Sequence, residues 1–206
     1  VFNLSRRPCT VDAVHNIACD LASADSINSA CTTLRDALVA PAETALIHNA
    51  SQMRKDSVRD CDSDDLRAVL ETNVVAINAL NTQLLPLMGE RSSLLYVGST
   101  LSEKAVPGSF SYVLSKHAQP GMMIATTQDL MGSGIHTAMI CPGFTDTEML
   151  RTDLGPDPAV ASSIASMNSF NLLIEPGEIA ELIHWTHHNP VINGAVLHAN
   201  LGQKES

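Results

Sequence analysis

A tyrosine and a lysine stand four residues apart in the segment 109–116, SFSYVLSK. In a helix, Tyr112 and Lys116 would project from one face, because side chains at positions i and i+4 lie above one another. Ser99 precedes Tyr112 by thirteen residues and follows a short apolar run. A hydroxyl, a phenol and an ammonium group around one small volume can bind and protonate a carbonyl oxygen, and the ammonium lowers the pKa of the phenol by stabilising its phenolate. The pattern therefore predicts acid–base chemistry at a carbonyl or an alcohol.

A buried strand and a helix must position these three side chains. Residues 94–97 are an apolar run that ends at Gly98, which is typical of a strand in a parallel sheet covered on both faces. Comparable strands are predicted at residues 1–5, 15–21, 45–49, 136–141 and 192–199. Apolar residues make up 45% of the chain and charged residues 17%, which suits a sheet buried between helices. We expect an α/β fold formed by one domain, residues 1–206.

A long apolar stripe predicts one helix over residues 63–89, interrupted on its buried face by Asn73. Ser63 is the expected N-cap, with acidic residues in the first turn. Residues 60–71 also match part of a calcium-loop pattern, but Asp65 stands where that loop needs glycine, so calcium binding is not expected. Pro120 lies inside the helix that carries Tyr112, and we expect it to kink that helix just beyond Lys116 and to loosen the placement of Lys116.

The net charge and the cysteine content limit which binding partners and which cellular compartment we expect for this protein. The formal net charge is -10 and no basic patch is visible, which argues against nucleic-acid and anionic-membrane partners. No apolar run approaches the roughly 18 residues that span a bilayer. Five scattered cysteines without a C-x-x-C pair indicate a reducing compartment, so we expect a cytoplasmic protein. Three histidines in the predicted helix 175–188 lack a carboxylate or cysteine partner, and no metal site is expected.

Taken together, the motifs resemble the short-chain dehydrogenase/reductase family. The resemblance rests on Ser99, the pair Tyr112-x-x-x-Lys116, Asn73 in TNVVA and Pro142-Gly143 in CPGFTDTEM. It implies a doubly wound, Rossmann-type parallel sheet in three α/β/α layers, and an NAD(P)-dependent oxidoreductase that interconverts a carbonyl and an alcohol by hydride transfer.

The resemblance also implies a role for each catalytic residue. Tyr112 would be the general acid and base, Ser99 would orient and polarise the carbonyl oxygen, and Lys116 would lower the pKa of Tyr112 and bind the nicotinamide ribose. Asn73 would hold a helix irregularity and a water that leads to Lys116.

Further residues are implied in cofactor binding. Arg6, after the first strand and next to Ser5, would accommodate a 2′-phosphate with Arg7 behind it, which favours NADP over NAD. The remaining implied contacts are Asp20 and Leu21 at the adenine, the turn Asn49, Ala50 and Ser51, and Pro142, Gly143, Thr145 and Thr147, together with Tyr112 and Lys116 themselves. Residues 145–175 would form a substrate lid, irregular over 152–173, and a homodimer or homotetramer is expected by resemblance.

One family feature is missing from this sequence. The family opens with a strand, a glycine-rich turn and a helix that cradle the pyrophosphate, but no G-x-x-x-G-x-G precedes Asp20. In the family's strand order, 3-2-1-4-5-6-7, the missing strand is central, and two strands would be split from five. Either the native protein has this segment, or the chain is a rearranged relative that binds dinucleotide poorly.

The absent turn, Ser51 in place of the family's glycine, and Pro120 favour an alternative function, a non-catalytic dinucleotide sensor or scaffold. The joint presence of Ser99, Tyr112 and Lys116 favours an enzyme.

Overall fold

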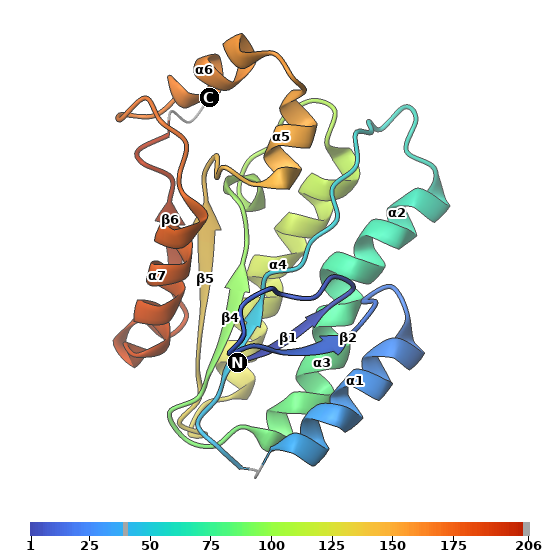
Figure 1. The fold of residues 1–206 in the computed structure, drawn as a ribbon, viewed down its shortest axis with the longest axis vertical. Helices are drawn as coiled ribbons and strands as arrows, with labels where there is room; N and C mark the ends of the chain where they lie inside the picture. Colours follow the sequence, from blue (N-terminus) through green and yellow to red (C-terminus); the bar gives the residue numbers. More distant parts are fainter. Residues whose placement is uncertain (39–40, 204–206) are drawn as a thin grey trace.

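Short apolar runs form six strands in the computed structural model, which describes residues 1–38 and 41–203. The strands are β1 (Phe2–Ser5), β2 (His15–Ala18), β3 (Ala45–His48), β4 (Ser93–Val97), β5 (His136–Pro142) and β6 (Val196–Ala199). Every pairing between these strands is parallel. β1 and β2 are joined by a loop, and from β2 onward helices lie between consecutive strands in the chain. The predicted Rossmann-like α/β fold is confirmed (Figure 1).

The strands fall into two sheets. One contains β1 and β2, and the other has the order β3-β4-β5-β6. The sequence predicted that two strands would separate from the rest, and they do. The second group has four members, so the expected number of five was wrong. In the larger sheet, His48 pairs with Tyr96, Val97 with Ile140 and Pro142 with Ala199, so the carboxyl ends of all four strands meet at one edge.

The long helix predicted at 63–89 consists of several consecutive helical segments. These are α2 (Ser63–Leu70), a π-helix (Glu71–Val75), α3 (Ala76–Leu84) and a 3₁₀ turn (Leu85–Leu87). Its N-cap is Asp62 instead of Ser63, because the Asp62 carboxylate accepts hydrogen bonds from the amides of Asp64 and Asp65. Asn73 lies in the π-helix, which confirms the irregularity expected at this residue.

Five further α-helices complete the described fold. They are α1 (Ala24–Ala37), α4 (Phe110–Asp129), α5 (Glu148–Leu154), α6 (Pro158–Ala165) and α7 (Pro176–His187), with short 3₁₀ turns at Thr100–Ser102 and Pro190–Ile192. The region expected to be irregular at 152–173 contains the end of α5 and all of α6, so that expectation was wrong. α4 continues through Pro120, and the kink itself stays a prediction.

Alternating residues of β4 and β5 supply the two faces of the larger sheet. Leu94, Tyr96 and Met139 pack with Ile77 and Met123 of the α3 and α4 side. On the opposite face, the neighbouring residues Leu95, Ala138 and Ile140 pack against Ile174 and Ile179, the latter in α7. The side chains thus follow the period of two that a sheet covered on both faces requires.

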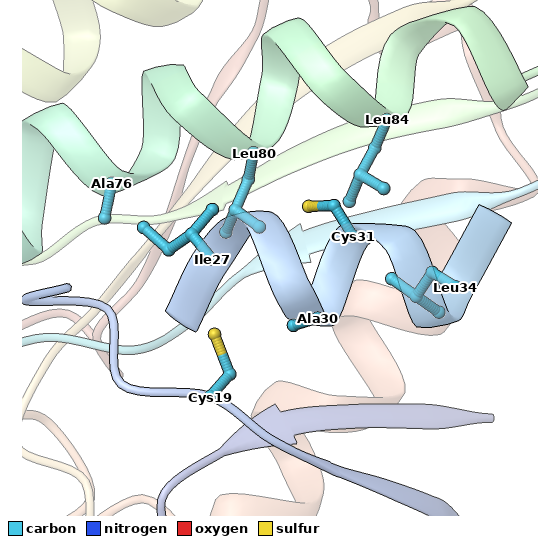
Figure 2. Close-up of a cluster of buried hydrophobic side chains, with 8 residues drawn as sticks. All are labelled: Cys19, Ile27, Ala30, Cys31, Leu34, Ala76, Leu80 and Leu84. Atoms are coloured by element: carbon cyan, nitrogen blue, oxygen red, sulfur yellow. The ribbon is translucent and has the colours of Figure 1, made fainter. Parts of the chain in front are cut away.

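A third core joins the two-stranded sheet to the rest of the molecule. Ile27 and Cys31 of α1 face Leu80 and Leu84 of α3, and Cys19, just after β2, approaches α1 (Figure 2). Phe2, Leu4 and Ile17 of β1 and β2 pack against the same cluster. The β1–β2 pair is therefore held to the fold through α1.

Candidate active site

Lys116 is the most buried charged side chain of the predicted site, with 2% of its surface exposed. Its ammonium group donates to the Val97 carbonyl at 3.0 Å and to Gln119 Oε1 at 3.3 Å. The same nitrogen lies 5.6 Å from the centroid of the Tyr112 ring. Burial lowers the pKa of Lys116 to about 8, and the nearby Cys141 raises it by less.

Tyr112 lies in the first turn of α4 and is 8% exposed. Burial raises the pKa of its phenol, while the hydroxyls of Ser99 and Ser51 oppose that rise by a smaller amount. The ammonium group of Lys116 lies 5.6 Å from the centroid of this ring, and the expected lowering of the Tyr112 pKa by Lys116 stays a prediction. Ser51, Ser99 and Tyr112 nevertheless meet in one place, as a carbonyl-binding site requires.

Ser99 occupies the tip of β4, where it caps the 3₁₀ turn Thr100–Ser102. Its oxygen accepts a hydrogen bond from the Leu101 amide at 3.1 Å, which leaves the hydroxyl proton available for a substrate oxygen. The preceding Gly98 is required by close packing. A Cβ there would lie 3.0 Å from Met139 Sδ and 3.1 Å from Cys141 Sγ.

Asn73 is fully buried in the π-helix. Its amide nitrogen donates to the Ser115 hydroxyl at 2.9 Å and to the Gln52 carbonyl at 2.8 Å, and its Oδ1 accepts from the Gln52 amide at 2.7 Å. Ser115 in turn donates to the Tyr112 carbonyl at 2.8 Å. Asn73 therefore ties the loop after β3 to the catalytic turn of α4.

Asp56 was missed by sequence reasoning, although it holds the start of α4. Its carboxylate accepts hydrogen bonds from both the amide, at 3.0 Å, and the hydroxyl of Ser111. The regular N-cap residue of α4, Ser109, makes no side-chain cap, so Asp56 supplies the cap from a distant segment. Spacing could not reveal this contact, because the two residues are 55 positions apart.

The residues implied in binding the nicotinamide end gather at the carboxyl edge of the larger sheet. Asn49 and Ala50 are exposed just beyond β3. Pro142 ends β5, and the Gly143 amide donates to the Ala199 carbonyl at 2.9 Å. Thr145 donates through its hydroxyl to the Gly143 carbonyl at 3.1 Å.

Two side chains near this edge have hydrogen-bond donors to offer a nicotinamide cofactor. The Ser51 hydroxyl is buried, and its oxygen has no partner within normal hydrogen-bond geometry among the described residues. The Lys116 ammonium group uses two of its three protons to bond the Val97 carbonyl and Gln119 Oε1. These free donors fit a nicotinamide ribose. No glycine precedes Gly89, so the residues present do not supply a glycine-rich pyrophosphate turn.

The residues implied at the adenosine end lie apart, in the β1–β2 unit. Ser5 ends β1, and its hydroxyl accepts from the Arg7 amide at 3.2 Å. Arg6 is exposed. Asp20 closes a local turn by accepting from the Ala22 amide at 3.0 Å, and Leu21 packs on the core around α1.

The expected lid is tied to the rest of the chain by ion pairs. Arg7 bonds Glu148 of α5 at 2.7 Å, and Lys55 bonds Asp153 of α5 at 2.6 Å. A cavity of about 570 Å³ lies between the loop after β3 and α5, lined by Arg7, Met53, Arg54, Lys55, Glu148, Met149, Thr152 and Asp153. The Thr147 hydroxyl caps α5 by accepting from the Leu150 amide at 3.3 Å.

Residues 1–38 and 41–203 contain no group of three or more His, Cys, Asp or Glu side chains arranged to hold a metal ion. The same stretch has no helix with the length and apolar character needed to cross a membrane.

Comparison with known proteins gives consistent results. A family profile described as "Enoyl-(Acyl carrier protein) reductase" matches residues 5–204. A sulfoacetaldehyde reductase from Chromohalobacter salexigens is 27% identical over 73% of this chain and 60% of its own length. A 2-keto-3-deoxy-L-fuconate dehydrogenase from Xanthomonas campestris pv. campestris is 30% identical over 85% of this chain and 66% of its own length. The chain thus spans less than two thirds of either relative.

Among solved structures, a short chain dehydrogenase from Burkholderia cenocepacia in complex with NADP superposes with a TM-score of 0.81. It is 26% identical, and the match covers 92% of this chain and 76% of that one.

Proposed function

Because the chain belongs to the short-chain dehydrogenase/reductase family, we propose that it is an oxidoreductase that interconverts a carbonyl and an alcohol with NADP(H). The observation that carries the proposal is the grouping of a phenol, a hydroxyl and a buried ammonium at the carboxyl edge of the sheet. Nothing in a purely structural role requires Tyr112, Ser99 and Lys116 to converge there.

The proposed chemistry assigns one step to each side chain. The Ser99 hydroxyl donates to the carbonyl oxygen of the substrate and orients it, and the Tyr112 hydroxyl delivers a proton to that oxygen. The positive charge of Lys116 stabilises the phenolate that remains. When bound, the reduced nicotinamide supplies the hydride for the carbonyl carbon. At neutral pH Lys116 is mostly charged, because its pKa is about 8.

Arg6 and Arg7 support NADP in preference to NAD. They follow β1, which corresponds to the second strand of the family's sheet, and an arginine at that place accommodates a 2′-phosphate. The NADP complex of the Burkholderia structure is consistent with this choice. We further propose one domain with residues 145–175 as its lid, a small-molecule substrate, a cytoplasmic location and a homodimer or homotetramer.

A non-catalytic dinucleotide sensor or scaffold is the competing function. The observation in its favour is Ser51, which stands where the family's turn after β3 has a glycine. Turnover separates the two proposals, because a sensor binds the cofactor without oxidising it.

Tyr112→Phe tests the enzyme proposal. The substitution keeps the ring and removes the proton donor, so kcat/KM should fall by about 10²–10⁴-fold while NADPH affinity, measured by fluorescence titration, stays near wild type. NADPH oxidation is followed by absorbance with a panel of aldehydes and ketones.

The matched control is Tyr96→Phe, which also removes a buried phenol oxygen but within the core, where Tyr96 bonds Asn81 and Thr126. A wild-type rate in Tyr112→Phe, or no oxidation by wild type with any substrate, would contradict the proposal.

A further inference from the structure

A glutamine side chain joins the backbone of Asn73 to the ammonium group of Lys116. Gln119 is 1% exposed and lies three residues after Lys116, on the same face of α4. Its Nε2 donates to the Asn73 carbonyl at 3.0 Å, and its Oε1 accepts from Lys116 Nζ at 3.3 Å. One side chain therefore spans the two groups that the family resemblance expected a water to connect.

The orientation of this amide is fixed by its two partners. The Asn73 carbonyl can only accept and the Lys116 ammonium can only donate, so the NH₂ group must face Asn73 and the oxygen must face Lys116. A reversed amide would place two donors together. Unlike a water, the amide cannot pass a proton by turning over, because each end has a single role here.

We propose that Gln119 is a positioning residue for Lys116, holding the ammonium group between its own Oε1 and the Val97 carbonyl and replacing a water-mediated link from Asn73. The catalytic meaning of this assignment rests on the proposed function, since Lys116 matters to turnover only if Tyr112 transfers protons.

Both hydrogen-bond acceptors of the Lys116 ammonium group are neutral, so neither of them compensates its positive charge. Besides Gln119, the titratable groups that face Lys116 are Tyr112 on α4 and Cys141 on β5. Removing the Gln119 acceptor should disfavour the charged lysine, and replacing it by a carboxylate should favour it. The two changes thus act in opposite directions on one measurable group.

The experiment titrates Lys116 in the full chain by NMR with ¹³C-labelled lysine. The chain has only three other lysines, Lys55, Lys104 and Lys204, and Lys116→Met identifies the signal. Gln119→Leu should lower the Lys116 pKa from its wild-type value and Gln119→Glu should raise it, each by about one unit or more. The alkaline limb of the kcat/KM profile should move in the same directions. Gln128→Leu and Gln128→Glu, at an exposed site on the same helix, should move neither.

The outcomes separate this inference from the proposed function. If the Lys116 titration shifts as expected but no variant and no wild type turns over, the Gln119 assignment stands and the enzyme proposal fails. If wild type turns over through Tyr112 and the titration in Gln119→Glu coincides with wild type, the Gln119 assignment is overturned. Gln119→Glu decides the matter if Gln119→Leu does not fold, because the carboxylate keeps an acceptor at the buried ammonium.

Discussion

The imidazole of His48 is buried in a polar chain through the core. Its Nε2 lies 2.6 Å from Asn81 Oδ1, and the Asn81 amide donates to the Tyr96 hydroxyl at 3.2 Å. Since Oδ1 only accepts, Nε2 must carry the proton of a neutral ring. Burial lowers the pKa of His48 to about 4, although the bond to Asn81 opposes that shift. Neutral His48 therefore joins β3 to α3 and β4 at physiological pH.

This burial predicts an acid-sensitive stability. Between pH 6.5 and pH 4 the unfolded chain binds a proton at His48 that the folded chain does not, so the free energy of unfolding should fall as the pH drops through this window. The full effect is about 3 kcal/mol. His48→Gln keeps an NH donor for Asn81 without titrating, and it should flatten the dependence measured by urea unfolding at each pH. His117→Gln, at an exposed histidine on α4, should keep the wild-type slope, whereas an equal slope in His48→Gln would contradict the assignment.

At the residue scale, the residues that carry the proposed chemistry were easier to predict than the residues that hold them in place. Tyr112 and Lys116 are one helical turn apart, so local spacing placed them on one face, and Ser99 ends a strand recognisable by its apolar run. Gln119 carried a similar local signal, a polar residue one turn from Lys116 on a buried face. The raised pKa of Tyr112 could not be predicted, because it depends on how much of the surrounding fold removes the phenol from water.

At the scale of elements, the start of α4 depends on a segment outside the helix. The Asp56 amide donates to the Gly108 carbonyl at 3.2 Å and the Phe110 amide donates to the Asp56 carbonyl at 3.1 Å. With the carboxylate on Ser111, these contacts fix the turn that precedes Tyr112. Sequence patterns located the helix but not this cap, since a cap from a distant loop has no fixed spacing. They also chose Ser63 over Asp62 as the N-cap of α2, a shift of one residue that local preference cannot resolve.

Asp56→Ala should therefore weaken both the fold and the site. Loss of the cap should cost about 0.5–2 kcal/mol in urea unfolding, and kcat should fall because Tyr112 is next to the released Ser111. Burial raises the pKa of Asp56, but the two hydrogen bonds from Ser111, together with Cys61 and Arg54, outweigh it, so the net pKa lies below the usual value. The stabilisation should thus be present above pH 3.8 and be lost as the pH falls through the lower, folded-state pKa. Asp12→Ala, at an exposed loop carboxylate, is the control, and equal stability of the two variants would refute a capping role.

At the scale of the whole molecule, the three clusters of buried side chains in the described chain form two partly separate regions. One lies on both faces of the β3–β6 sheet, and the other joins β1 and β2 to α3 through α1. The sequence predicted the separation from a family strand order. It could not show how the β1–β2 pair stays attached, because that depends on the packing of Ile27 and Cys31 against Leu80 and Leu84 (Figure 2). Local opening should therefore begin in the unit formed by β1, β2 and α1, because this unit is attached through the packing of α1 on α3.

Matched isoleucine truncations in the two cores test this division. Ile27 is 1% exposed on α1, and Ile179 is 8% exposed on α7, the helix that also carries Trp185. Each change to alanine should cost about 2–5 kcal/mol locally. Ile27→Ala should speed hydrogen exchange in β1, β2 and α1 by about 30-fold or more, while the unfolding midpoint followed by Trp185 fluorescence changes little. Ile179→Ala should shift the Trp185 midpoint strongly and leave exchange in β1 and β2 near wild type. If both variants shift the Trp185 midpoint equally, the chain unfolds as one cooperative unit, and attachment through α1 is then not a separate step.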